Sequence, residues 1–89
     1  MEVSPHLISL IAISKRRKQV LLELEKYTMS QPELRKITGM YKSHISRTIK
    51  ELLSKNLIAC RNPKDKAFRF YKITSLGKKV INEVERIIN

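Results

Sequence analysis

The order of apolar and polar residues predicts a mainly helical chain with one pair of strands. Between residues 42 and 55, apolar side chains at positions 45, 49, 52 and 53 fall on one face of a helix. A shorter helix precedes it and is expected to bury Leu34 and Ile37. Residues 57–61 predict a strand, and residues 67–74, rich in aromatic and β-branched side chains, predict its returning partner. Apolar side chains at positions 80, 81, 84, 87 and 88 then form a stripe that predicts a last helix, capped by Ser75.

Short-range signals mark the ends of the helices. Pro5 is tolerated in the first turn of a helix, so the first helix is expected to begin there. Ser14 and the four basic residues after it predict a kink or a restart. Ser30 and Glu33 have the spacing of a capping box at the start of the short helix. Gly39 supplies the left-handed residue that often ends a helix.

Together these elements indicate the fold class and its divisions. Asn56 tolerates a left-handed position and is expected to end the helix at 42–55, and residues 62–65 predict a turn between the strands. The expected fold is mainly α, in the α+β class: a winged helix-turn-helix with a three-helix core, a two-stranded β wing and a C-terminal dimerisation helix. The expected divisions of a single domain over residues 1–89 are the helix-turn-helix at 31–55, the wing at 57–74 and dimerisation helices at 5–14 and 76–89.

Val20, Leu21 and Leu24, which follow Ser14, have the spacing of an amphipathic helix that continues to about Lys26. The predicted core takes one apolar face from this helix and from each of the other elements. It comprises Val20, Leu21, Leu24, Leu34, Ile37, Ile45, Ile49, Leu52, Leu53, Leu57, Ile58, Tyr71 and Ile73. A chain of 89 residues buries only roughly 60–65% of its unfolded surface, so this core is modest.

Positive charge is concentrated in one part of the chain. The chain has 19 Lys and Arg against 8 Asp and Glu, which gives a net charge of +11. Thirteen of the basic residues and only two acids, Glu51 and Asp65, lie between Arg35 and Lys79, and the remaining charges cancel. An ordinary solvated surface would scatter its charges more evenly. The concentration therefore favours a surface that binds a polyanion, either nucleic acid or an anionic membrane.

Other classes of function have little support in the sequence. The longest mostly apolar run, residues 7–13, is far shorter than the roughly 20 residues of a membrane-spanning helix. Its basic residues follow it, whereas those of a secretion signal precede it. The single cysteine, Cys60, excludes an internal disulfide and is interpreted as a packing residue of a strand, with a redox sensor as the alternative. The two histidines are far apart, and no nucleophile–base pair or glycine-rich phosphate loop is present, so we expect no metal, no cofactor and no enzymatic activity.

The helix at 42–55 has the side chains of a DNA recognition helix. With Ile45 turned to the core, Ser43 and Arg47 fall on the opposite side. A short serine allows close approach, and Arg47 can donate two hydrogen bonds to the edge of a guanine. The alternative is that Arg47 forms a surface salt bridge with Glu51, four residues later.

Five segments follow one another in a characteristic order. They are Met29-Ser30-Gln31-Pro32-Glu33-Leu34, Thr38-Gly39-Met40, Ile45-Ser46-Arg47, Leu52-Leu53-Ser54-Lys55-Asn56-Leu57-Ile58 and Ile73-Thr74-Ser75-Leu76-Gly77-Lys78. In this order, over residues 13–88, the chain resembles a winged-helix transcription regulator of the MarR family, with ArsR-type regulators a close second. Asp65 also lies eight residues before Ile73, which is the spacing of the wing aspartate in that family.

The resemblance and the basic surface imply a sequence-specific regulator of transcription that binds double-stranded DNA. Its recognition helix is expected in the major groove and its wing on the backbone or in the minor groove. The alternatives are a low-specificity or chromatin-type nucleic-acid-binding winged helix and an interaction module of a larger machine. We expect a cytoplasmic protein with no membrane partner, and no small-molecule effector because the chain lacks the extra helices that form the ligand pocket in most of the family. The expected DNA-binding residues are Lys42, Ser43, His44, Ser46, Arg47, Lys50, Arg61, Lys64, Lys66 and Arg69.

The two ends of the chain carry apolar side chains beyond those of the predicted core. Such a patch, left uncovered in a small monomer, marks an interface. We therefore expect a homodimer formed by the first and last helices, and the alternative is that the first helix folds back over its own domain. The predicted interface residues are Leu7, Leu10, Ile11, Val80, Val84, Ile87 and Ile88.

Overall fold

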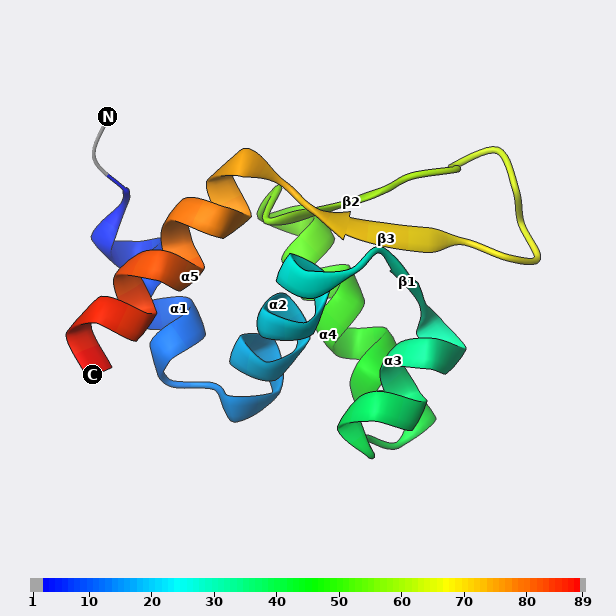
Figure 1. The fold of residues 1–89 in the computed structure, drawn as a ribbon, viewed down its shortest axis with the longest axis horizontal. Helices are drawn as coiled ribbons and strands as arrows, with labels where there is room; N and C mark the ends of the chain where they lie inside the picture. Colours follow the sequence, from blue (N-terminus) through cyan, green and yellow to red (C-terminus); the bar gives the residue numbers. More distant parts are fainter. Residues whose placement is uncertain (1–2, 89) are drawn as a thin grey trace.

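The computed structural model describes residues 3–88, with side chains as far as residue 87. Its elements are α1 (Pro5–Ala12), α2 (Lys15–Lys26), β1 (Met29–Ser30), α3 (Gln31–Thr38), α4 (Lys42–Ser54), β2 (Ile58–Cys60), β3 (Phe70–Ile73) and α5 (Ser75–Ile88). In Figure 1, α1 and α5 lie side by side at one end of the molecule, and α3 and the loop between β2 and β3 lie at the opposite end. The mainly helical winged helix-turn-helix that the sequence predicts is confirmed.

Two serine side chains explain where α2 and α3 begin. The Oγ atom of Ser14 accepts a hydrogen bond from the backbone N–H of Arg17 at 3.2 Å, so the chain ends α1 and restarts as α2. The Oγ atom of Ser30 accepts from the backbone N–H of Glu33 at 3.3 Å, and Oε1 of Glu33 accepts from the backbone N–H of Ser30 at 3.1 Å. Both the restart and the capping box are therefore confirmed.

Left-handed residues and a threonine cap define the later helix ends. Gly39 ends α3 at a φ of 72° and Asn56 follows α4 at a φ of 60°, as predicted. At the start of α5, however, the Oγ1 atom of Thr74 accepts from the backbone N–H of Gly77 at 3.0 Å. The prediction that Ser75 caps this helix is wrong, because Ser75 is already its first helical residue.

The sheet has three antiparallel strands in the order β1-β3-β2, one more than predicted. Met29 of β1 pairs with Tyr71 of β3, and Ile58 of β2 pairs with Ile73 of β3. Strand β1 is only two residues long, so it leaves no alternating pattern in the sequence. Strands β2 and β3 are shorter than predicted, because residues 61–69 form a loop.

The core lies where α2, α4, α5 and the sheet meet. Its buried apolar residues are Ile11, Val20, Leu21, Leu24, Met29, Leu34, Ile45, Ile49, Leu52, Leu57, Ile58, Tyr71, Val80, Ile81 and Val84. Leu53 and Ile73 are partly buried against this core. The prediction that Ile37 is buried is wrong: its side chain is 52% exposed beside a shallow surface pocket that it lines with Met29, Glu33 and Lys36.

Helix α1 packs against α5 of the same chain. Ile11 of α1 is fully buried, as are Val80, Ile81 and Val84 of α5. The prediction that Ile11, Val80 and Val84 are left uncovered in a monomer and form an interface is therefore wrong. These side chains fill the contact between α1 and α5, which is the alternative in which the first helix folds back over its own domain.

Fewer apolar side chains remain uncovered at this end of the molecule. Ile13, which follows α1, is 80% exposed and Ile87 of α5 is 64% exposed. Leu7 and Leu10 are half-buried. The predicted interface residue Ile88 has a side chain that lies outside the described residues.

Gly77 allows the first turn of α5 to pack directly on the chain that enters β2. A Cβ atom at this position would overlap the carbonyl oxygen of Leu57 and would lie 2.7 Å from Cγ1 of Ile73. The same Leu57 carbonyl accepts the backbone N–H of Thr74 at 3.1 Å, so it cannot shift without weakening that hydrogen bond. The position therefore requires glycine for space.

We predict that Gly77→Ala lowers the free energy of unfolding by about 1–3 kcal/mol, because the added methyl group overpacks a backbone contact. Urea denaturation measures this loss. The control is Ser75→Ala on the exposed side of the same turn, which should change stability by no more than about 0.5 kcal/mol. Equal stability of Gly77→Ala and the unaltered chain would contradict the explanation.

Candidate nucleic-acid interface

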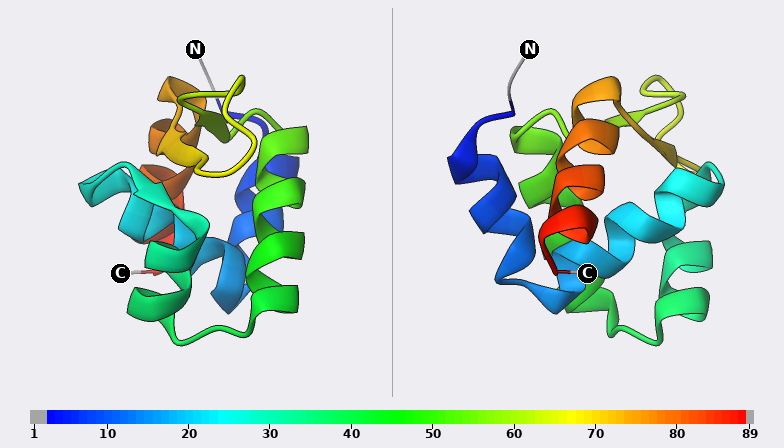
Figure 2. Two further views of the ribbon diagram at one scale, coloured as in Figure 1. Left: turned by 90° about the vertical axis from the view of Figure 1, so that its right-hand side faces the viewer. Right: turned by 60° about the vertical axis from the view of Figure 1, so that its left-hand side comes forward.

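Helix α4 has one buried side and one uncovered side. Ile45, Ile49 and Leu52 are at most 2% exposed and face the core. Thr48 is also buried, and its hydroxyl donates to the carbonyl of His44 at 2.8 Å, so its polar group is satisfied within the helix. The left view of Figure 2 shows α4 along one edge of the molecule, which leaves its outer side open.

The side chain of Arg17 joins α4 to α2 by an ion pair and to α1 by a hydrogen bond. The guanidinium of Arg17 donates from Nε to Oε2 of Glu51 at 2.9 Å, and a second N–H of the same group donates to the same oxygen. Its third hydrogen bond goes to the carbonyl of Leu10 at 3.0 Å. Arg17 therefore connects the C-terminal half of α1, the start of α2 and the C-terminal half of α4.

This ion pair contradicts the alternative interpretation of Arg47. Glu51 pairs with Arg17 rather than with Arg47, which lies one turn before it on α4. Within residues 3–88, the exposed side chain of Arg47 makes no hydrogen bond or ion pair. Its guanidinium is therefore available to a ligand outside the chain.

The wing loop, which comprises residues 61–69 between β2 and β3, is held by the side chains of Asn62 and Asp65. The Oδ1 atom of Asn62 accepts from the backbone N–H of Phe70 at 2.8 Å, and its amide donates to the carbonyl of Phe68 at 2.6 Å. The Oδ1 atom of Asp65 accepts from the backbone N–H groups of Ala67 and Phe68, both at 2.9 Å. These hydrogen bonds give the exposed loop a defined shape without a core of its own.

The hydrogen bonds at the tip of the wing also stabilise the charged form of Asp65. The backbone N–H of Phe68, that of Ala67 and the nearby charge of Arg69 hold the pKa of the Asp65 carboxyl below its ordinary value. Arg69 also donates from Nε to the backbone carbonyl of Asp65 at 3.0 Å. Arg69 therefore contributes to the shape of the loop as well as to its charge.

The structure exposes most of the predicted DNA-binding residues. Lys42, Ser43, Arg47, Lys50, Arg61, Lys64, Lys66 and Arg69 are exposed, whereas His44 and Ser46 are half-buried on the flanks of α4. The start of α4 and the wing loop project at the end of the molecule opposite to α1 and α5 (Figure 1). One end of the molecule therefore carries both elements that the sequence assigned to DNA.

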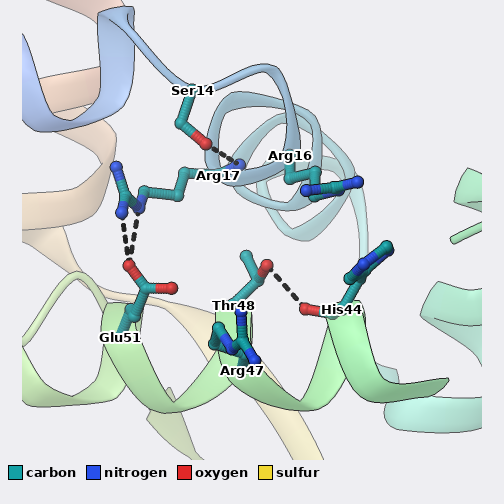
Figure 3. Close-up of a pocket in the computed structure, with 7 residues that line it drawn as sticks. All are labelled: Ser14, Arg16, Arg17, His44, Arg47, Thr48 and Glu51. Carbon is teal, nitrogen blue, oxygen red and sulfur yellow. Dashed lines mark hydrogen bonds and ion pairs between the residues drawn. The ribbon is translucent and has the colours of Figure 1, made fainter. Parts of the chain in front are cut away.

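A pocket of about 280 Å³ lies between the start of α2 and α4. Figure 3 shows the residues that line it, which are Ser14, Arg16, Arg17, His44, Arg47, Thr48 and Glu51. Arg16 is absent from the predicted site because it lies outside the part of the chain with excess charge. The signal that identifies it is the run of four basic residues in the first turn of α2, where no acid offsets them.

Neither a metal-binding cluster nor a membrane-spanning helix is found in the described part of the chain. No group of three or more His, Cys, Asp or Glu side chains in residues 3–88 is arranged to hold a metal ion. None of the helices in the same residues is long and apolar enough to cross a membrane.

We predict that the wing loop loosens in acid as Asp65 becomes protonated. Because the pKa of Asp65 is lowered in the folded state, its contribution is complete above the ordinary aspartate pKa. That contribution is lost as the pH falls through the lowered value. The amide resonances of Ala67 and Phe68 should shift together in an NMR titration, with a midpoint below the ordinary pKa of aspartate, about 3.9.

The variant Asp65→Asn is the control for this titration. It keeps an acceptor oxygen but cannot be protonated in this range, so the shared shift of the two amides should disappear. A midpoint at or above the ordinary aspartate value would contradict the proposed hydrogen bonds.

Solved structures of bacterial and archaeal regulators share this fold. Wild-type MarR from E. coli in its apo form has a TM-score of 0.80 and 20% sequence identity, covering 94% of this chain and 64% of that chain. BldR from Sulfolobus solfataricus has a TM-score of 0.77 and 22% identity, covering 90% and 58%. A cysteine-to-serine variant of E. coli MarR complexed with operator DNA has a TM-score of 0.77 and 21% identity, covering 94% and 61%. The chain therefore spans less than two thirds of the length of each of these proteins.

Sequence comparison identifies the family. No curated protein matches the sequence of this chain. Residues 6–89 match the model of a regulatory family rather than of an enzyme family, that of the methanogenesis regulatory protein FilR1, N-terminal domain. The chain, with the winged-helix fold of MarR-type regulators, therefore belongs to the family of FilR1 N-terminal domains.

Proposed function

We propose that this chain binds double-stranded DNA in a sequence-specific manner and regulates transcription as a homodimer. Helix α4 occupies the major groove, and the wing contacts the backbone or the minor groove. The observation that carries this proposal is the guanidinium of Arg47, which lies on the uncovered side of α4 and has no partner within residues 3–88. The only acidic residue of α4, Glu51, is paired with Arg17. The proposed partner is DNA, and the proposed location is the cytoplasm.

The dimensions and chemistry of α4 support a position in the major groove. An α-helix with its side chains is about 10–12 Å across, and the major groove is about 12 Å wide. The outermost side chains, Ser43, Arg47 and Lys50, are exposed and together offer a small hydroxyl, a bidentate donor and a point charge. This polar variety favours base recognition over uniform binding to the backbone.

The wing supports a second contact with the DNA backbone. Lys64 and Lys66 are exposed on a loop whose shape is fixed by Asn62 and Asp65. An ordered loop loses less conformational entropy on binding than a mobile one. Two proteins that share the fold add support: the MarR variant from E. coli is complexed with operator DNA, and a MepR variant from S. aureus is bound to an oligodeoxyribonucleotide.

The surface left uncovered at the far end of the molecule supports a homodimer. Helices α1 and α5 lie at the end opposite to the wing (Figure 1). Leu7 and Leu10 of α1 are half-buried, and Ile13, directly after α1, and Ile87 of α5 are exposed. A two-fold axis through this end would place both copies of α4 on one side of a duplex. The target would then be a pseudo-palindrome with half-sites about one helical turn apart, or a multiple of that distance.

We predict that Arg47→Ala and Lys64→Ala have different effects on DNA binding. Loss of Arg47 should cost about 1–3 kcal/mol and relax the preference at one position of the site. Loss of Lys64 should weaken binding to all sequences alike and lower the salt slope by about one. Fluorescence anisotropy measures both effects, with duplexes selected from a random pool and with random duplex.

The comparison also separates specific from low-specificity binding. If both variants lose affinity equally for selected and random duplexes, Arg47 does not contact bases and the low-specificity alternative replaces the proposal. If the unaltered protein binds neither duplex, the interaction-module alternative replaces it.

We predict that the double variant Ile13→Glu, Ile87→Glu is monomeric. Both side chains are exposed in one copy, so the variant should keep the stability of the monomer while charges oppose the interface. In analytical ultracentrifugation the unaltered protein should sediment at twice 10.4 kDa and the variant at 10.4 kDa. Tyr27→Glu, at a side chain 70% exposed at the end of α2, is the matched control and should stay dimeric. An unaltered chain that is monomeric yet binds DNA tightly would contradict the dimer.

A further inference from the structure

The start of α2 carries more positive charge than helix stability favours. Lys15, Arg16, Arg17 and Lys18 form its first turn, and no acidic residue accompanies them. The N-terminus of a helix is the positive end of its dipole, so cations are unfavourable there and anions are favourable. Departures of this kind from local stability rules are expected at functional sites.

One of these cations has a structural partner and another does not. Arg17 is held by Glu51 and by the carbonyl of Leu10. Arg16 is exposed and makes no hydrogen bond or ion pair within the described residues. Figure 3 shows Arg16 and His44 on the same side of the Arg17–Glu51 pair, where they line the pocket between α2 and α4.

We propose that this pocket is an oxyanion site that holds one phosphate of the DNA backbone. The guanidinium of Arg16 matches the paired oxygens of a phosphate group. The imidazole of His44 can donate an N–H from the opposite wall, and the start of α2 adds its positive dipole. The proposal rests on the DNA-binding function above and adds Arg16, a residue of α2, to the contact surface.

The pocket lies on the flank of α4, and this position is the reason for assigning the bound phosphate to the DNA backbone. Ser43 lies on the outermost line of α4 and His44 lies on the flank that faces α2, while Arg47 lies between them at the edge of the pocket. A helix that enters the major groove has a phosphate backbone along each flank. The backbone beside α2 therefore passes the mouth of the pocket, and Arg47, at the edge of that pocket, extends from it toward the base edges.

Arg17 offsets the charge of the acid in the pocket, and the second carboxylate oxygen of that acid, Glu51, makes no hydrogen bond among the residues drawn in Figure 3. Glu51 is the only carboxylate that lines it, and the Arg17 guanidinium donates two hydrogen bonds to one oxygen of that carboxylate. Arg16 and Arg47 then leave the pocket with a net positive charge. The volume of about 280 Å³ accommodates a phosphate group together with its neighbouring water.

The experiment compares Arg16→Gln with Lys15→Gln, a neighbouring exposed residue that does not line the pocket. Both variants remove one positive charge. Anisotropy titrations against a labelled duplex of mixed sequence, at several salt concentrations, should show that Arg16→Gln lowers the salt slope by about 0.9. Lys15→Gln should leave the slope nearly unchanged, and Arg16→Lys should restore part of the loss. The loss should be the same for selected and random duplexes.

Two results of these titrations would overturn the assignment. Equal losses for the two glutamine variants would mean that only the total charge matters. A change in sequence preference for Arg16→Gln would mean that Arg16 contacts bases instead of a phosphate. A thermal melt of each variant establishes that the fold is intact.

Inorganic phosphate tests the chemistry of the pocket without DNA. At constant ionic strength, phosphate should shift the Arg16 side-chain and His44 ring resonances in the unaltered protein and in Lys15→Gln. The His44 shift should be absent in Arg16→Gln. Shifts from free phosphate combined with an unchanged salt slope for Arg16→Gln would overturn the DNA assignment in favour of a free anion. If the unaltered protein bound no duplex, the proposed function would fail, and this titration alone would then decide whether the pocket binds oxyanions.

Discussion

The position of α4 depends on the partly buried ion pair between Arg17 and Glu51. An isolated surface ion pair contributes at most about 1 kcal/mol, because solvent screens it and two flexible side chains must be ordered. Here the two side chains are only 21% and 35% exposed, and a third hydrogen bond to the carbonyl of Leu10 fixes the guanidinium. The apolar stripe of α4 sets which side of the helix faces the core. The ion pair adds a directional contact that fixes α4 against the start of α2 and the end of α1.

The same ion pair decides which arginine is free to bind a ligand. An arginine and a glutamate four residues apart on an exposed helix stabilise it by only about 0.3–0.5 kcal/mol. Arg17 makes two hydrogen bonds to Glu51 and is ordered by a neighbouring helix, so it displaces Arg47 as the partner of this acid. A contact within the fold thus removes the negative charge from α4 and leaves Arg47 uncommitted. The ion pair between Arg17 and Glu51 therefore both stabilises α4 and leaves Arg47 free to bind a ligand. The four-residue spacing of Arg47 and Glu51 in the sequence predicts neither role.

Local signals predicted the elements well because each depends on neighbouring residues. The capping box at Ser30 and the left-handed residues Gly39 and Asn56 need no knowledge of the rest of the chain. The errors arise where a distant contact decides between equal local choices. Thr74 and Ser75 are both good caps, but Thr74 also donates to the carbonyl of Asn56 at 2.7 Å, which fixes its side chain in the capping position. The apolar ends of the chain likewise required a cover, and their pattern did not show whether α5 of the same chain or a second copy supplies it.

The sequence likewise predicted only part of the candidate site. The residues of α4 and the wing follow from periodicity and from the excess of charge between Arg35 and Lys79. Arg16 does not, because acids elsewhere in the sequence cancel its charge in any count over a long segment. Two of those acids, Glu23 and Glu83, pair with Lys26 and Arg86 instead, and a helix dipole acts only over its first turn. Four adjacent cations lie at the start of α2, and of these four only Arg17 has an acidic partner among the described residues. A contact from α2 on one flank of α4 and one from the wing beyond it would fix the depth of α4 in the groove, and that depth determines whether the guanidinium of Arg47 can reach a base.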